Sequence, residues 1–379
     1  MPTKLIVLQM KKAIAALAII AALIAAILMF SSRFKVTDNI YVEWQGERVA
    51  IRGEGSAGLK WTINRGFLSM TANETVGKNL KIHLSGECAN GQFELTATKR
   101  TFVRLEGLKL LNPTDVALVF KGNKPTFLTL ADDTENTLGD AGIEASGDLT
   151  IGGDGSLTII AQGTGHKGIN IEGNLKIKDD PTLTITTSGQ PERMQLLPES
   201  VWLGKGPGLP PNVGEGDRLP PPPPGFVRYD FSGTAKAIKA QGTILIEGGT
   251  ITLSTCTPGA EGLESKRDII INGGILNVDA YDDAINALMT MTVNGGIVNA
   301  KSSHNDGIDI NGGQLKPWAT SIPKNFDPQR AKELAGQPTY FQTGGSVTAR
   351  TTAGPPEEGL DTDHVPISHT GGELNILDK

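Results

Sequence analysis

Apolar and polar residues alternate along most of the chain, in short runs separated by glycine. Examples are TITLS, ILNVDA and SVTAR in the C-terminal half, and YVEWQ, RVAIRG and LKWTINRG near the N-terminus. A period of two places successive side chains on opposite faces of a β-strand, which a helical pattern does not do. We therefore predict an all-β fold, in which residues 34–80 form a β lead-in or cap.

A longer repeat is superimposed on this alternation. A small residue, an apolar residue and usually a polar residue recur together every 22 to 26 residues wherever the pattern is uninterrupted. This spacing is typical of one coil of a parallel β-solenoid, in which equivalent residues stack about 4.8 Å apart. We predict a parallel β-helix over residues 81–379. The expected inward residues are Phe93, Leu118, Ile143, Ile169, Ile238, Leu263, Ile285, Ile308 and Leu360.

Paired glycines provide a second landmark in the repeat. Glycine adopts positive φ without steric cost, so each pair is expected in a tight turn between strands. The pairs are Gly152-Gly153, Gly248-Gly249, Gly273-Gly274, Gly295-Gly296, Gly312-Gly313, Gly344-Gly345 and Gly371-Gly372.

Two insertions interrupt the predicted coils. Residues 190–233 contain PGLPP and LPPPPPG, which cannot join the interior of a sheet. Residues 316–340 contain a short helix pattern around residues 328–335 and three aromatic residues, Trp318, Phe326 and Tyr340, that could contact a sugar ring. Long excursions from a solenoid often shape a binding groove.

The N-terminus carries an export pattern. Lys11 and Lys12 precede an uncharged apolar run over residues 13–30. We interpret residues 1–33 as a hydrophobic helix that acts as a signal peptide or an uncleaved membrane anchor; the two remain open. Either one places the remainder outside the cytoplasm, as a secreted, periplasmic or cell-surface protein that meets the membrane only through this segment.

Acidic residues recur beside the inward positions of the last coils. Stacked like charges repel, and Ca²⁺ would relieve this because it takes six to eight oxygen ligands in flexible geometry. The alternative is a solvated acidic edge that discourages pairing with other sheets. The predicted best site consists of Asp283, Asn286, Asp306 and Asp309, and Asp282, Glu261 and Glu264 are further candidate ligands.

Lys239 falls in the same column as these acids. A lysine beside an acidic groove could act as a base in β-elimination, but an ion pair with Glu264 one coil away is the simpler interpretation. The five histidines occupy unrelated coil positions, and no arrangement of nucleophile and base emerges. The net charge of −6 and the lack of a basic stripe argue against nucleic acid as a partner, and we expect a monomer.

Several phrases resemble a known family. LTLADDTENTLGD and the paired turns DDAIN and NDGID are similar to bacterial carbohydrate-binding domain-containing β-helix proteins, and the resemblance extends over about residues 40–379. It implies a right-handed β-helix, bound Ca²⁺, and binding of cellulose or an acidic, pectin-like polysaccharide without established catalysis. The metal ligands it implies are Asp282, Asp283, Asn286, Asp306 and Asp309. Lys167 and Lys236 depart from the acidic pattern, which disfavours a metal in their turns.

The main hypothesis is therefore an extracytoplasmic, calcium-dependent protein that binds cellulose or an acidic polysaccharide such as polygalacturonate. The first alternative is a calcium-dependent polysaccharide lyase, with Lys239 or another cationic residue of the groove as the base. The second is a structural or adhesive solenoid on the cell surface. The three differ in whether the protein retains a polysaccharide, cleaves it, or does neither.

Overall fold

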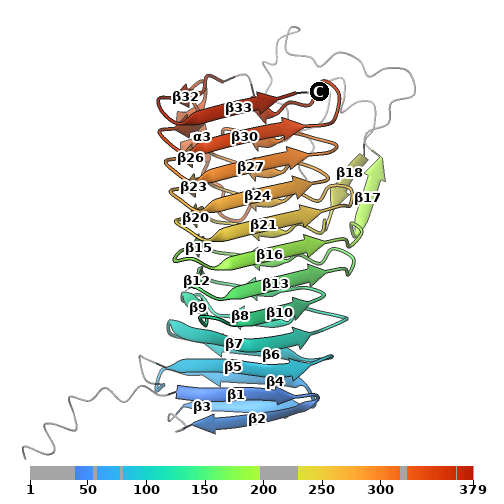
Figure 1. Cartoon of the computed structure of the whole chain (residues 1–379), viewed down its shortest axis with the longest axis vertical. Coiled ribbons are helices and arrows are strands. Elements are labelled where there is room, and N and C mark those ends of the chain that lie inside the picture. Colours follow the sequence, from blue (N-terminus) through green and yellow to red (C-terminus); the bar gives the residue numbers. More distant parts are fainter. Residues whose placement is uncertain are drawn as a thin grey trace, which may run out of the picture. The chain divides into compact units, whose positions relative to one another are not determined.

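The computed structural model describes residues 39–53, 58–76, 80–196, 229–315, 322–363 and 365–378. These residues form an all-β parallel solenoid with almost no helix, and its coils stack along one axis (Figure 1). One 11-stranded sheet contains β3 (Leu59–Asn64), β4 (Phe67–Ala72), β6 (Gln92–Ala97), β8 (Leu118–Lys121), β11 (Ile143–Ala145), β14 (Ile169–Ile171), β19 (Ile238–Ala240), β22 (Leu263–Ser265), β25 (Ile285–Ala287), β28 (Ile308–Ile310) and β31 (Leu360–Asp361).

A 20-stranded sheet forms the remaining walls. It begins with β1 (Asn39–Gln45), β2 (Arg48–Gly53), β5 (Lys81–Cys88) and β7 (Thr101–Leu111). From β7 one ladder continues through β9 (Thr126–Leu130), β12 (Leu149–Gly153), β15 (Leu175–Ile177), β20 (Ile244–Ile246), β23 (Ile269–Ile271), β26 (Met291–Val293), β29 (Tyr340–Gln342) and β32 (Ser368–His369). The other continues through β10 (Glu135–Gly139), β13 (Ser156–Ala161), β16 (Thr182–Thr187), β21 (Thr250–Thr255), β24 (Ile275–Ala280), β27 (Ile297–Ser302), β30 (Ser346–Thr351) and β33 (Glu373–Leu377).

The inward residues stack as the repeat predicts. Ile238 pairs in register with Leu263, Leu263 with Ile285, and Ile285 with Ile308. All four side chains are fully buried. Their columns form the core, because each apolar residue of a coil packs on its equivalents above and below. The same register fixes the outward neighbours of these residues, which carry the candidate chemistry.

The strands at the N-terminal end of the described chain are antiparallel. β1 pairs with β2, and β3 pairs with β4, whereas β1 and β4 also pair in parallel with β5 and β6. These two hairpins carry charged residues on their outer strands, including Arg48, Arg52 and Lys60. Charged side chains on an edge strand discourage pairing with another sheet.

Most of the glycine pairs in the C-terminal half lie in the equivalent turn of successive coils, but Gly312-Gly313 does not. Gly274 and Gly296 each have positive φ, and a Cβ on Gly274 would lie 2.7 Å from the carbonyl oxygen of Gly249. Gly312-Gly313 instead follows β28, where the chain leaves the coil. The assignment of this pair to the common turn was wrong, because a Gly-Gly dipeptide with positive φ fits the bend after β28 as well as the turn between the other strands.

The first insertion begins and ends with a short antiparallel ribbon of β17 (Arg193–Leu196) and β18 (Tyr229–Ser232). The proline-rich stretch between them lies outside the described residues, as do residues 1–38 with the predicted signal peptide or anchor. Within the part of the chain that the structure describes, no helix has the length and apolar character needed to cross a membrane.

The second insertion contains α3 (Pro328–Leu334), which confirms the predicted short helix. Asp327 caps it by accepting a hydrogen bond from the backbone N–H of Arg330 at 3.0 Å. Tyr340 is fully buried in β29, with its hydroxyl 2.8 Å from Gln342 Oε1. Its expected contact with sugar was wrong, because it stacks on Met291 in the wall of the solenoid. Trp318 lies outside the described residues.

Candidate functional site

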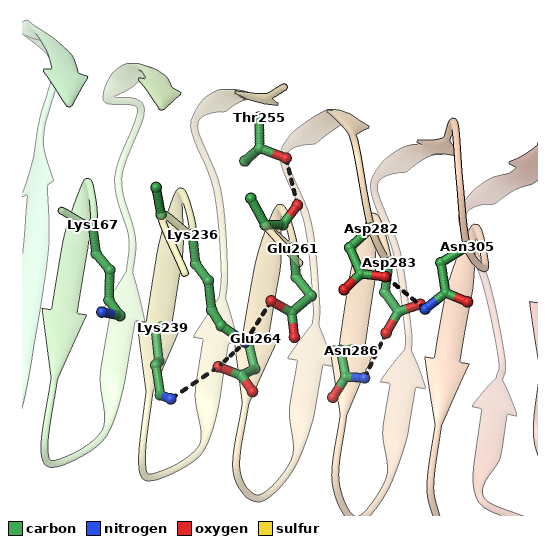
Figure 2. Close-up of polar contacts among 12 residues, drawn as sticks. Lys167, Lys236, Lys239, Thr255, Glu261, Glu264, Asp282, Asp283, Asn286 and Asn305 are labelled. Atoms are coloured by element: carbon green, nitrogen blue, oxygen red, sulfur yellow. Dashed lines mark hydrogen bonds and ion pairs between the residues drawn. The ribbon is translucent and has the colours of Figure 1, made fainter. Parts of the chain in front are cut away.

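One row of mostly charged side chains runs across five neighbouring coils, and Figure 2 labels part of it, from Lys167 to Asn286. Two positions per coil contribute to it: the residue two before the inward residue and the residue one after it. The strands β14, β19, β22, β25 and β28 hold these positions in register. We call this set the charged row; its members are Lys167, Asn170, Lys236, Lys239, Glu261, Glu264, Asp283, Asn286, Asp306 and Asp309.

Three carboxylates meet at the acidic end of the charged row. One oxygen each of Asp283, Asp306 and Asp309 lies within 4.8 Å of the others. Their exposed fractions are 1%, 6% and 6%. The alternative of a solvated acidic edge is therefore wrong for these three side chains, because they are buried within the turns.

Asn286 and the backbone hold this carboxylate cluster. Nδ2 of Asn286 donates to Asp283 Oδ2 at 2.9 Å and to Asp309 Oδ2 at 2.8 Å. The backbone N–H of Asp306 donates to Asp283 Oδ1 at 3.3 Å. The backbone N–H of Glu358 donates to Asp306 Oδ1 at 2.7 Å, which connects the cluster to the next coil.

Burial and neighbouring negative charge both change the pKa of Asp306. Burial raises the pKa of Asp306 to about 8, and the nearby carboxylates of Asp309, Glu357 and Asp361 add to this effect. The hydrogen bond from Glu358 acts in the opposite direction. A proton on Asp306 removes one of the like charges, which makes burial of the cluster less unfavourable.

Asp282 lies outside the cluster, although it is adjacent to Asp283. Its Oδ1 accepts a hydrogen bond from Asn305 Nδ2 at 2.7 Å, and its side chain is half-buried. Figure 2 shows this pair on the turn beside the cluster. Asp282 and Asn305 thereby join two successive turns.

The two coils before the carboxylate cluster, those of β19 and β22, combine glutamates with lysines. The Lys236 ammonium contacts both Glu261 and Glu264, at 2.9 Å from Glu264 Oε2. Lys239 lies 3.3 Å from the same oxygen, which confirms the predicted ion pair, and Lys266 contacts Glu264 Oε1. The structure therefore brings Glu261 and Glu264 together with ammonium groups, not with the three aspartates. Lys266 was not singled out from the sequence, since it lies three residues after Leu263, outside the two repeating positions.

The protonation of this group follows from burial and charge. Burial raises the pKa of Glu264, but Lys236, Lys266 and Lys239 outweigh it and hold the pKa well below its usual value. Burial raises the pKa of Glu261, and Lys236 offsets only part of this effect. For Lys236, burial lowers the pKa, but the two glutamates outweigh it and keep the pKa above its usual value.

Two lysines at the basic end have lowered pKa values. Burial lowers the pKa of Lys167, and the neighbouring charges of Lys239 and Lys236 act in the same direction. Glu264 raises the pKa of Lys239, but burial together with Lys236 and Lys266 outweighs that carboxylate and lowers it. The charged row therefore changes from an excess of ammonium groups to an excess of carboxylates within a few coils.

A family profile described as "Carbohydrate-binding domain-containing protein" matches residues 71–191 and 228–307, more than half of the chain. The chain belongs to this carbohydrate-binding domain-containing family. Membership supports a carbohydrate-related function and a polysaccharide as the partner. The family match includes Lys236, Glu264, Asp283 and Asp306, and it ends just before Asp309.

One solved structure similar to this family member is the polysaccharide lyase-like protein from C. thermocellum, in its gadolinium derivative. It shares 17% sequence identity and a TM-score of 0.45, and the alignment covers 72% of this chain and 92% of that chain. No curated protein matches the chain.

Proposed function

We propose that the protein is an extracytoplasmic, calcium-dependent carbohydrate-binding protein that recognises cellulose or an acidic, pectin-like polysaccharide. Family membership supports the carbohydrate, and the hydrophobic sequence of residues 13–30 supports the location. The observation that carries the proposal is the charged row, in which regularly spaced coils place unlike charges along one line. Its partly exposed lysines, Lys167 and Lys239, lie on neighbouring coils, so an acidic polymer would contact them one after the other at the spacing of the strands.

The carboxylate cluster fits a calcium ion. Asp283, Asp306 and Asp309 provide hard oxygen ligands close together, and their mutual repulsion would be offset by a divalent cation. Asn286 faces two of them with its amide nitrogen, so it would serve as a partner of the ligands unless its amide group turns over. The proposal leaves out Glu261 and Glu264, because ammonium groups already neutralise them.

The burial of the cluster determines what Ca²⁺ would do there. With 6% exposure or less, the three carboxylates are covered by the protein's own turns. We infer that the ion holds the turns of β25 and β28 together, instead of bridging to a carboxylate of the polysaccharide. Binding would then depend on calcium through the order of these turns.

The lysines at the basic end of the charged row favour an acidic polymer over a neutral one as the ligand. Lys239 and Lys266 are only partly buried, with side chains 20% and 25% exposed. Lys167 has Gly165 O as an acceptor at 3.1 Å and faces two other ammonium groups. A uronate carboxylate beside Lys167 and Lys239 would offset this excess of positive charge.

Affinity electrophoresis tests the proposal. Gels that contain polygalacturonate or hydroxyethyl cellulose should retard the protein in Ca²⁺, and EDTA should remove most of the retardation. Lys167→Ala should weaken retardation on polygalacturonate alone. The matched control is Lys176→Ala, because Lys176 pairs with Glu247 outside the charged row. Unretarded migration on every polysaccharide would rule out the binding function.

A second candidate function is β-elimination of a uronate polymer. The observation in its favour is the lowered pKa of Lys239, since a lysine that loses its proton more easily is a better base. The ion pair with Glu264 works against it by holding the ammonium group in place. Ultraviolet absorbance of unsaturated product from polygalacturonate, absent in Lys239→Ala, would establish the lyase. Retention without any product would leave binding as the function.

A further inference from the structure

The second insertion returns over coils that were formed much earlier in the chain. We call residues 322–339, which include α3, the strap. Arg330 makes two hydrogen bonds to the Asp268 carboxylate, at 2.7 and 2.6 Å. Lys324 Nζ lies 3.3 Å from Glu172 Oε2, and Asn325 Nδ2 donates to the Glu172 carbonyl at 3.1 Å. The strap is thereby fastened to the coils of β14 and β22.

A cavity of about 440 Å³ lies between the strap and these coils. Asn325 and Arg330 line it from the strap, and Asn174, Thr243, Arg267 and Asp268 line it from the solenoid. Its size falls within the range of pockets that hold small molecules. None of the residues that line the cavity belongs to the charged row. The charged row lies at the beginning of β14, β19 and β22, whereas the cavity lies beyond the ends of these strands.

The floor of the cavity is a ladder of fixed polar groups. The backbone N–H and Nδ2 of Asn174 donate to Asp148 Oδ1 at 2.8 and 3.0 Å. The backbone N–H of Thr243 donates to Asn174 Oδ1 at 2.8 Å. A Cβ on Gly242 would lie 2.5 Å from Asn174 Oδ1, so the ladder requires glycine there. Groups held in this way need little reorganisation when a ligand binds.

The charges around the cavity balance. Asp148 and Asp268 oppose Arg267 and Arg330, so the lining offers donors and acceptors without an excess of either sign. A sugar hydroxyl both donates and accepts, which suits this mixture. A uronate carboxylate would gain little here, because Arg330 already binds Asp268 and Arg267 lies 3.8 Å from Asp327 Oδ2.

We propose that this cavity binds a neutral sugar residue of a polysaccharide through its hydroxyl groups. This inference rests on the carbohydrate-binding function proposed above, and assigns the neutral part of the ligand to a site separate from the charged row. The strap lies beyond the end of the family match at residue 307. The solenoid residues that line the cavity lie within that match, so the site joins a family-matched floor to a strap outside the match.

The test measures binding of cellohexaose and of an oligogalacturonide by isothermal titration calorimetry with the full chain in Ca²⁺. Thr243→Trp places an indole ring in the cavity and should weaken cellohexaose binding at least tenfold. Thr243→Val, which keeps the shape but removes the hydroxyl, should weaken it less. Oligogalacturonide binding and the thermal midpoint should not change. Lys324→Ala is the matched control, since it removes an exposed strap contact without altering the cavity lining.

The outcomes separate this inference from the proposed function. If the unaltered protein binds the oligogalacturonide but not cellohexaose, the cavity proposal fails and the proposed function stands. If Thr243→Trp retains full cellohexaose affinity with an unchanged thermal midpoint, the neutral sugar binds elsewhere and the cavity proposal also fails. If neither sugar nor any polysaccharide binds, both proposals fail together.

Discussion

The Lys236 ammonium lies 2.9 Å from Oε2 of Glu264, which is one coil further along the solenoid. It also contacts Glu261, so one buried lysine bridges both acids of that coil, and Lys239 and Lys266 add further positive charge beside Glu264. In the following coils the equivalent positions carry Asp283 and Asp306, which gather with Asp309. The solenoid thus has two ways to offset stacked acids: a built-in ammonium group in one coil, and, as we propose, a bound cation in the next two.

Removing Lys236 should leave two buried carboxylates without their main partner. Lys236→Met is expected to lower the free energy of unfolding by about 3 kcal/mol or more, because an uncompensated buried charge is costly. Urea denaturation without added metal measures this. Ca²⁺ should restore more stability to the variant than to a Lys266→Met control, which removes a more exposed partner of Glu264. Equal losses in the two variants would contradict the special role of Lys236.

Removal of calcium should destabilise the protein, and the acidic cluster should account for this loss. At a calcium concentration about 100 times the dissociation constant, binding to the folded state contributes about 2.7 kcal/mol. Asp306→Asn should abolish saturable uptake in calorimetric titration. In EDTA at neutral pH this variant should be about as stable as the unaltered chain, because the raised pKa already keeps Asp306 largely protonated and the substitution replaces one neutral group with another.

The control for the cluster is Asp279→Asn. Asp279 is an acid of β24 that pairs with Lys301 at 2.8 Å, away from the three aspartates. It should leave calcium uptake unchanged. Full uptake in Asp306→Asn would show that the ion, if it binds, lies elsewhere.

Acid should remove the contribution of Glu264. Burial raises the pKa of Glu264, but the three lysines outweigh burial and hold the folded pKa well below its ordinary value of 4.5. As the pH falls, the unfolded state therefore takes up the proton first. The stabilisation is therefore complete above pH 4.5 and is lost as the pH falls below it toward the folded pKa. Glu261 acts in the opposite direction, since its pKa is raised. In urea unfolding, the free energy of unfolding should fall less steeply with decreasing pH below 4.5 in Glu264→Gln than in Glu172→Gln, a surface control.

The stacked inward residues should carry most of the stability of each coil. Ile285→Ala is expected to cost about 2–5 kcal/mol, because the fully buried side chain cannot be replaced without a cavity. Ile297→Ala is the matched control, since Ile297 is 45% exposed on the outer face of β27, and it should cost under about 1 kcal/mol. Chemical denaturation compares the two. A similar loss in both variants would argue against the inward assignment of Ile285.

The candidate site could be predicted only in part. The positions of Asp283, Asp306 and Asp309 follow from the repeat, because strand register converts equal spacing in sequence into contact in space. Their burial does not follow from the repeat, because an acidic turn of a solenoid can be exposed to solvent as readily as it can be covered by neighbouring turns. The contact of Lys236 with two glutamates depends on the reach of its long side chain across coils, which spacing does not define.

The sequence by itself determined the parallel β-solenoid and its register. Each coil repeats the same local pattern, an alternating strand with an inward residue such as Ile285 or Ile308. A coil whose own pattern is weak can therefore be placed from the spacing of the coils on either side. Only the tertiary structure decided the path of the strap and the core position of Tyr340, because an insertion has no repeat that predicts where it packs. The cavity beneath Arg330 arises from contacts between segments far apart in the chain, and such contacts leave no periodic signal in the sequence.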